Sequence, residues 1–270
     1  MSYPDEQNKR AWEARSKLFG ASLRSVLFKG LPDAFNQHLH NWHKQIILGS
    51  IKKKDEIRVL DVGCGYGRLS SLILGQWPDA EILGIDLCEN YVKLYEEKTG
   101  RPAQVGRIES LPHGLGGFDY ILCVTVLMYV DLENVRTSIS NLLAHLKPEG
   151  TLILIEPDSS GRPFQTGFGI FTALIKRLTG NEVGTGGRSF GSREMRKLLD
   201  LAGGVIVSEE RLPVTSLFFL PIALIGRALS QGMSKRIYGG VSVLDGFLGG
   251  FKLPSIYVAY RISKNPERQR

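Results

Sequence analysis

A glycine-dense turn between two regular elements constrains the fold of this chain more than any other stretch. Residues 57–62 form an apolar run, residues 63–67 read G-C-G-Y-G, and a helical pattern begins at Arg68. A strand, a tight turn and a helix in this order direct backbone N–H groups and the positive helix end toward a polar or anionic ligand. Glycines let the backbone turn and let the ligand approach the main chain. This stretch therefore predicts a site for a nucleotide-like ligand.

The spacing of the glycines separates two classes of nucleotide-like ligand. A dinucleotide-binding turn, G-x-G-x-x-G, carries a third glycine where the helix packs closely on the strand. Counting from Gly63, that position is occupied by Arg68, so the turn reads G-x-G-x-G with Asp61 two residues before it. The missing glycine disfavours a dinucleotide.

An acidic residue stands at the end of the second predicted strand. Residues 81–85 read E-I-L-G-I, which is typical of a short buried strand, and Asp86 follows directly. A carboxylate roughly 20 residues past such a turn is placed to accept hydrogen bonds from the ribose of an adenosine. Asp86 also begins a D-x-x-E capping pattern for a helix over residues 89–98. The two roles are compatible.

Five further strands are predicted, and helices over residues 132–146 and 188–203 lie among them. Proline and glycine at residues 146–150 (L-K-P-E-G) end the first of these helices and start the next strand. The five strands are expected at residues 103–108, 118–124, 151–156, 205–210 and 255–262.

These motifs resemble those of the class I S-adenosylmethionine (SAM) methyltransferases. The resemblance implies an α/β fold: a Rossmann-like, seven-stranded, mostly parallel sheet with helices on both faces and an antiparallel last strand. It also implies SAM as the cofactor and S-adenosylhomocysteine (SAH) as the product. By the same resemblance, cofactor contacts are expected from Asp61, Gly63, Cys64, Gly65, Arg68, Asp86, Leu87, Arg107, Ile108, Glu109 and Val124.

The expected cofactor contacts of two arginines, Arg107 and Arg68, have alternatives. Many relatives have an aspartate that binds the adenine amino group where this chain has Arg107, and arginine cannot accept a hydrogen bond. Either the backbone N–H of Ile108 or the carboxylate of Glu109 would then address the ring. Arg68 either pairs with the SAM carboxylate through its two-pronged guanidinium or lies on the helix surface.

The N-terminal segment contains a helix with three histidines. Apolar residues recur with a helical period over residues 33–51, which also carry His38, His40 and His43. Since successive helical residues turn by ~100°, His40 and His43 share a face and His38 does not. A metal site from this helix alone is therefore not expected. Residues 1–50 are predicted to form a helical lid, with the histidines either near the surface or facing the substrate.

A general base helps transfer to a hydroxyl group. No histidine follows His145, so the late histidine base of many O-methyltransferases is missing. Tyr66 and Tyr129 are expected as polar walls of the substrate site. The candidate catalytic residues are His38, His40, His43 and Glu156.

Two insertions interrupt the expected core of residues 51–264. They span residues 157–187 and 212–251, and residues 265–270 form a tail. The apolar run in the second insertion is too short to cross a membrane. The insertions are predicted to line a hydrophobic substrate pocket and to make peripheral contact with membrane lipid. In the alternative interpretation they only pack on the edge of the sheet.

We therefore predict a SAM-dependent methyltransferase for a small, fairly hydrophobic acceptor, such as a lipid, a quinone precursor or a natural product. The alternatives are a protein or peptide N-methyltransferase and a non-catalytic SAM-binding protein. No [N/D]-P-P-[Y/F/W] follows residues 118–124, and the net charge of +7 is spread along the chain, so no nucleic-acid substrate is expected. Three widely spaced cysteines fit neither a disulfide framework nor zinc, and the polar N-terminus carries no secretory pattern, which indicates the cytoplasm.

Overall fold

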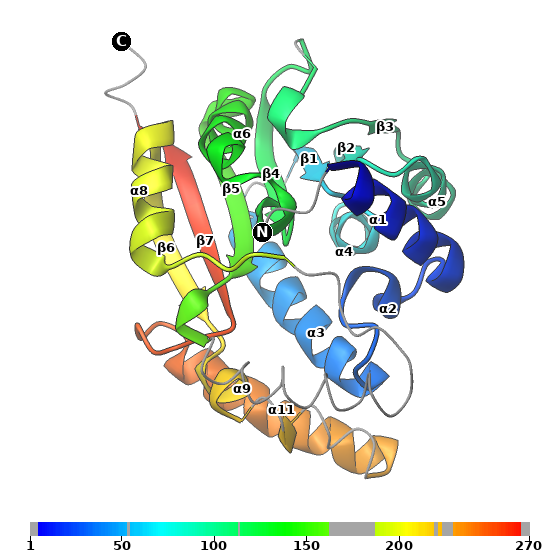
Figure 1. The fold of residues 1–270 in the computed structure, drawn as a ribbon, viewed down its shortest axis with the longest axis vertical. Coiled ribbons are helices and arrows are strands. Elements are labelled where there is room, and N and C mark those ends of the chain that lie inside the picture. The colour runs from blue at the N-terminus through cyan, green and yellow to red at the C-terminus, as the bar shows by residue number, and fades with distance from the viewer. Residues whose placement is uncertain are drawn as a thin grey trace.

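A seven-stranded sheet forms the centre of the structure, a computed structural model that describes residues 5–52, 55–112, 114–161, 187–218, 221–222 and 229–265. Its strand order is β3-β2-β1-β4-β5-β7-β6 (Figure 1). The strands are β1 (Arg58–Val62), β2 (Glu81–Asp86), β3 (Ala103–Val105), β4 (Phe118–Val124), β5 (Leu146–Pro157), β6 (Gly204–Arg211) and β7 (Tyr257–Lys264).

The described helices lie on both faces of this sheet and across one of its ends. Short 3-10 turns are η1 (Ile108–Ser110), η2 (Leu127–Tyr129) and η3 (Ser159–Gly161). The α-helices are α1 (Asp5–Phe19), α2 (Leu23–Val26), α3 (Asp33–Ser50), α4 (Arg68–Leu74), α5 (Glu89–Thr99), α6 (Leu132–Ala144), α8 (Ser192–Ala202), α9 (Pro213–Leu217) and α11 (Gln231–Leu248).

Strand direction confirms the predicted sheet. β1 pairs in parallel with β2 and β4, and the pairs β2–β3 and β4–β5 are also parallel. β7 runs antiparallel to both of its neighbours, β5 and β6. Seven strands with one antiparallel strand are the fold class that the motifs predicted. The β6–β7 pair is not a tight hairpin, because α9 and α11 lie in the connection between the two strands.

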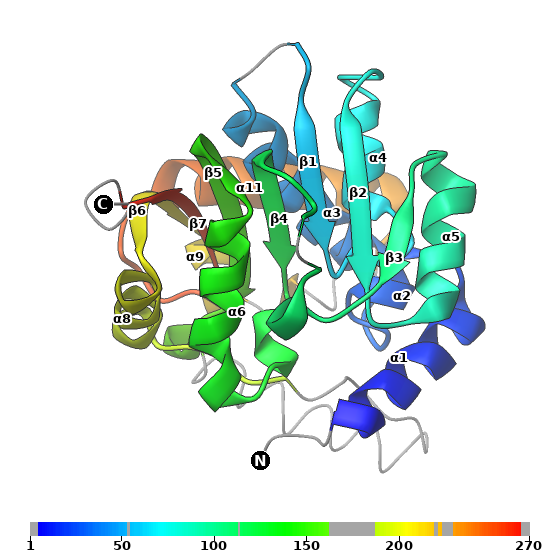
Figure 2. The same cartoon turned by 90° about the horizontal axis from the view of Figure 1, so that it is seen from above.

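Alternating residues in the strands form two cores. On one face, Leu122 of β4 packs with Phe35 and Ile46 of α3. On the other face, Ile121 packs with Ile139 of α6 and with apolar residues of α8. Side chains of successive strand residues point to opposite faces, so a strand buried on both sides is apolar throughout. Figure 2 shows α6 and α8 in front of the sheet, and α3 and α4 behind it.

Two predicted strand boundaries were wrong by three residues or more, and the helix predicted over residues 188–203 begins only at Ser192. The third strand ends at Val105, and Ile108 instead begins the turn η1, which carries the chain across the sheet end. The fifth strand begins at Leu146, because Leu146 already pairs with Phe118 across a register shift. Most of the first predicted insertion, 157–187, lies outside the described residues, as do parts of the second and the tail from residue 266 on.

The N-terminal helices cover the end of the sheet where β1, β2 and β4 finish. Figure 2 shows α1 and α2 across these carboxyl ends. The carboxyl end of a parallel sheet, where the strand order reverses, is the usual ligand site of such folds. Within the part of the chain that the structure describes, no helix is long and apolar enough to cross a membrane.

Candidate active site

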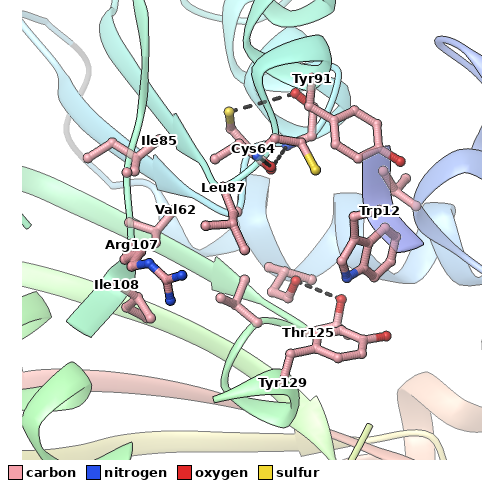
Figure 3. Close-up of a pocket in the computed structure, with 18 of the residues that line it drawn as sticks. Trp12, Val62, Cys64, Ile85, Leu87, Tyr91, Arg107, Ile108, Thr125 and Tyr129 are labelled. Carbon is pink, nitrogen blue, oxygen red and sulfur yellow. Dashed lines mark hydrogen bonds between the residues drawn. The ribbon is translucent and has the colours of Figure 1, made fainter. Parts of the chain in front are cut away.

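A cavity lies at the carboxyl ends of β1, β2 and β4, in front of the glycine-dense turn. Figure 3 shows Val62, Ile85, Arg107 and Ile108 on one side of it, and Trp12, Tyr91 and Tyr129 on the other. Ten of the eleven predicted cofactor residues line this cavity: Gly63, Cys64, Gly65, Arg68, Asp86, Leu87, Arg107, Ile108, Glu109 and Val124. The remaining one, Asp61, lies beneath the turn.

The turn adopts the backbone that its glycines permit. Gly63, Gly65 and Gly67 all have left-handed φ, at 69°, 52° and 79°. The N–H groups of Gly63 and Cys64 donate to the carbonyl oxygen of Ile85, at 2.7 and 3.1 Å, which ties the turn to β2. A Cβ atom at Gly63 would overlap the side chain of Val126. The turn is therefore shaped by its own sequence as a cradle beside the cavity.

The Gly63→Ala variant is expected to be less stable than the matched variant Gly100→Ala. Gly100 has a similar φ of 64°, but open space surrounds its Cβ position. Both variants lose about 1–2 kcal/mol because alanine is strained in left-handed backbone. Gly63→Ala should lose a further ~1–3 kcal/mol by overpacking against Val126. Urea unfolding measures the unfolding free energy of both variants. Equal losses would show that Val126 leaves room for a Cβ atom at Gly63.

Asp86 joins the turn to the start of α5 and faces the cavity. Its Oδ2 accepts the N–H of Gly65 at 2.8 Å, and its Oδ1 accepts the N–H of Cys88 at 2.9 Å. Burial raises the pKa of this carboxyl to about 6, and the two N–H donors oppose the rise. The prediction that Asp86 caps this helix was wrong, because α5 begins at Glu89 and its N-cap residue is Cys88, which makes no side-chain capping hydrogen bond. Each carboxylate oxygen keeps a second lone pair for a ligand hydroxyl.

Arg68 lies buried on the cavity wall between two histidines of α3. Its Nη1 donates to Nδ1 of His40 at 2.9 Å, and its Nη2 donates to Nδ1 of His43 at 3.2 Å. Burial lowers the pKa of Arg68 to about 10. Among the described residues, no carboxylate lies within ion-pair distance of this guanidinium. The site thus holds a buried positive charge that faces the cavity.

The same contacts argue against His40 and His43 as general bases. Arginine has no acceptor, so both Nδ1 atoms accept from Arg68 and each ring carries its proton on Nε2. Burial, followed by the charge of Arg68, lowers the pKa of His40 to about 4, and it lowers the pKa of His43 well below its ordinary value. Neither ring has a lone pair left for a substrate proton in this arrangement. The two histidines share a face as predicted, and they position Arg68.

His38 and Glu156 lie away from the cavity wall. His38 contacts Thr215 through Nε2 at 2.9 Å and Ser242 through Nδ1 at 3.2 Å, which fixes α3 against α9 and α11. Glu156 accepts the N–H groups of Val126, Leu127 and Met128 at 2.7–3.1 Å. The alternative that the α3 histidines lie near the surface is wrong for His38 and His43, which are buried. The structure gives His38 and Glu156 positioning roles.

Three other predicted residues differ in their surroundings. Asp61 is buried beneath the turn and accepts the hydroxyl of Ser70 at 2.7 Å; burial raises its pKa to about 6. Tyr66 packs with Tyr91 and under the Lys98 ammonium, outside the cavity lining. Tyr129 does line the cavity, and its ring meets Trp12 edge-on at 5.3 Å. Only Tyr129 of the two predicted substrate tyrosines reaches the cavity.

Sequence reasoning missed most of the wall that α1 and the β4 end supply. Trp12 and Asn8 of α1 line the cavity, as does Thr125, which follows β4 with a left-handed φ of 58°. Such a φ is a strained conformation for a β-branched residue, and strain of this kind clusters at functional sites. A tryptophan in an otherwise charged segment was the only available signal for α1. Within the described residues, no group of three or more potential ligands could hold a metal ion.

Fold and cavity together define an α/β domain that binds a nucleoside-like ligand at the reversal of strand order. Residues 59–150 match a family model described as "Methyltransferase domain". This match, with the motifs above, identifies that part of the chain as a class I SAM-dependent methyltransferase domain, whose cofactor is SAM. The cavity fits SAM, since a glycine cradle, a carboxylate and a buried guanidinium line it.

Parts of this chain are similar in sequence to known proteins. The mitochondrial ubiquinone biosynthesis O-methyltransferase of Saccharomyces cerevisiae is 30% identical over 46% of the chain and 41% of that protein. The demethylmenaquinone methyltransferase of Staphylococcus carnosus is 26% identical over 54% of the chain and 62% of that protein. The matches therefore span about two to three fifths of these curated relatives.

One solved structure resembles the fold along nearly its whole length. The mycolic acid cyclopropane synthase CmaA1, solved with SAH and CTAB, superposes with a TM-score of 0.64 over 98% of this chain and 99% of that chain. The sequence identity is 16%, so the likeness concerns the fold alone.

Proposed function

We propose that this chain transfers the methyl group of SAM to a small, fairly hydrophobic acceptor. The observation that carries the proposal is the juxtaposition, in one cavity, of the left-handed glycine turn, Asp86 and the buried Arg68. Bound SAM would supply an electrophilic methyl group on a sulfonium. The residues of the chain would then align donor and acceptor and exclude water, which are the main contributions to an in-line displacement.

Each part of the cofactor has a proposed partner in the cavity. Asp86 would accept hydrogen bonds from the ribose, and Arg68 would pair with the carboxylate of the methionine part. Arg107, Ile108 and Glu109 line the end of the cavity near η1, where the adenine is expected. The carbonyl and N–H groups near Val124 would address the remaining cofactor atoms. These roles extend the resemblance residue by residue.

The acceptor side of the cavity supports a hydrophobic substrate. Trp12, Tyr129, Val126 and Val130 supply an aromatic and aliphatic wall. The names of the curated relatives refer to ubiquinone biosynthesis, demethylmenaquinone and cyclopropane-fatty-acyl-phospholipid, which are lipid-soluble or lipid-linked. We therefore favour a quinone precursor or a lipid over a peptide. The helical lid formed by residues 1–50, contact with membrane lipid and a cytoplasmic location remain part of the proposal.

The acceptor is expected to be nucleophilic before it binds. The Nδ1 lone pairs of His40 and His43 are engaged by Arg68, and His38 and Glu156 lie outside the lining of the cavity. A phenolic hydroxyl or an activated ring carbon of a quinone precursor needs less help from a base than an aliphatic alcohol does. Transfer to such an acceptor therefore suits this cavity better than transfer to an aliphatic hydroxyl.

Labelled methyl transfer tests the function directly. The purified chain would be incubated with methyl-tritiated SAM and, in parallel, with demethylated quinone precursors, with unsaturated phospholipid and with a peptide mixture. We expect label in the organic extract of the first or second reaction. Label in peptides alone would favour the peptide N-methyltransferase. SAH binding without label in any reaction would favour the non-catalytic SAM-binding protein.

The Arg68→Met variant should bind SAH about 10- to 100-fold more weakly, because a hydrogen bond to a charged group contributes about 1.5–3 kcal/mol. Methylthioadenosine lacks the amino-acid part, so its affinity should not change. Titration calorimetry with both ligands measures the two effects. An equal loss for both ligands would show that Arg68 acts on the shape of the cavity and not on the carboxylate.

A further inference from the structure

Helix α11 buries several polar residues and exposes several large apolar residues. A surface helix of a globular protein normally packs its apolar stripe on the core. Here the buried positions are Ser234, Tyr238 and Asp245, whereas Val243 and Phe247 are 72% and 76% exposed. Part of the apolar surface of this helix is thus left in solvent.

Polar contacts hold α11 in this orientation. The carboxylate of Asp245 accepts the N–H groups of Val214 and Thr215 at the start of α9. The hydroxyl of Tyr238 donates to the carbonyl oxygen of Ile222 at 2.7 Å, and its ring stacks on His38 of α3 at 5.3 Å. These buried hydrogen bonds make rotation of the helix about its axis costly. The apolar stripe is therefore fixed outward.

The exposed stripe continues beyond the helix. Met233, Val243, Leu244 and Phe247 recur with a helical period on the outer side of α11. Figure 1 shows α9 and α11 side by side along one end of the molecule. We call these residues and their exposed neighbours the α11 surface, which comprises Met233, Val243, Leu244, Phe247, Phe251, Leu253 and, from α9 and its end, Leu217 and Phe218.

The exposed charges of the segment that forms the α11 surface have one sign. Lys235, Arg236 and Lys252 are exposed within the same segment. Between residues 212 and 264 the only acidic residue is Asp245, and it is buried. At ~100° per residue, Lys235 lies beside the apolar stripe and Arg236 lies within it. Exposed apolar residues combined with lysine and arginine are typical of helices that lie in the plane of a membrane interface. Basic side chains near anionic lipid each add to such binding.

We propose that the α11 surface docks the protein on an anionic lipid bilayer. Phe247, Val243 and their apolar neighbours would enter the interface, and the basic residues would contact lipid phosphates. Pairing of this surface with a second copy is disfavoured, because a two-fold contact would bring the basic residues of both copies together without an acid to neutralise them. Docking requires neither SAM nor an acceptor, so it can be tested independently of methyl transfer.

Vesicle cosedimentation tests the proposal on the full chain. The wild-type protein should pellet with vesicles of phosphatidylcholine mixed with phosphatidylglycerol, and much less with phosphatidylcholine alone. The double variant Val243→Ser/Phe247→Ser should bind at least about tenfold more weakly, since it removes two apolar side chains from the interface. The double variant Lys235→Gln/Arg236→Gln should bind roughly 25-fold more weakly to the anionic vesicles.

Matched control variants show whether any loss of an exposed apolar side chain or of surface charge weakens vesicle binding. Leu18→Ser removes a side chain that is 74% exposed on α1, and Arg193→Gln/Lys197→Gln removes two exposed charges from α8. Both controls should bind vesicles like the wild type, and all variants should keep the wild-type melting temperature because the altered side chains are exposed. Equal losses in controls and α11 variants, or no pelleting of the wild type, would overturn the proposal. So would a dimer in light scattering that Val243→Ser/Phe247→Ser converts to a monomer.

Discussion

Replacement of Asp86 by alanine is expected to weaken SAH binding by at least about 30-fold. Hydrogen bonds to a charged group contribute about 1.5–3 kcal/mol each, and 1.4 kcal/mol corresponds to tenfold in affinity. Asp86 faces the cavity, and its carboxylate would accept from the ribose. Titration calorimetry measures the dissociation constant directly. An unchanged affinity in Asp86→Ala would remove the basis for the proposed cofactor pose.

Two controls separate ligand contact from folding. Asp86 also accepts the N–H groups of Gly65 and Cys88, so the alanine variant loses part of its stability. Thermal unfolding without ligand shows how much of the sample is folded during the titration. Glu81→Ala removes an exposed carboxylate from the same strand and should leave SAH affinity unchanged. Asp86→Asn keeps one oxygen acceptor and should give an intermediate loss.

The Glu156→Gln variant should lose about 2–4 kcal/mol of unfolding free energy at pH 5. The carboxyl group, which is protonated at pH 5 because burial raises its pKa to about 8, accepts three backbone N–H groups through its two oxygens from the residues that follow β4. Glutamine offers one oxygen, and its NH₂ group would face an N–H donor, which leaves buried donors unsatisfied at about 1–3 kcal/mol each. The matched variant Glu149→Gln changes an exposed residue of the same strand and should stay within about 0.5 kcal/mol. Urea unfolding compares the two.

The pH dependence of this difference has a definite sign. Burial raises the pKa of Glu156 from an ordinary value of 4.5 to about 8. The folded protein then binds its proton more tightly than the unfolded chain does, so the contribution of Glu156 to stability falls as pH rises from about 4.5 to about 8. Glutamine does not titrate. The difference in unfolding free energy between the wild type and Glu156→Gln should therefore decrease over this pH range. An increase of this difference with pH would contradict the raised pKa.

The sequence predicted the parts of the fold that depend on short-range patterns. The turn at residues 63–67, the strand Phe118–Val124 and the acidic end of β2 follow from glycine geometry, apolar runs and spacing within about 30 residues. The antiparallel last strand came from the resemblance to a family. These features need no knowledge of which distant elements pack together.

The rest depends on packing between distant segments. Helical periodicity placed His40 and His43 on one face, but only the packing of α3 on α4 brings Arg68 between them. Trp12 enters the cavity because α1 crosses the sheet end, and its Glu13 carboxylate accepts the N–H of Glu89 at the start of α5. The outward stripe of α11 could not be assigned, because its polar face is buried only in the presence of α3 and α9.

The long connection between β6 and β7 has a consequence for how such a chain can diversify. The two strands are neighbours in the sheet, yet residues 212–256, with α9 and α11, lie between them. Among the described residues, none that lines the cofactor cavity belongs to this connection. It could therefore be exchanged or lengthened over generations while donor binding is preserved. Selection on where the enzyme works and selection on how it binds its donor would act on separate stretches of the gene.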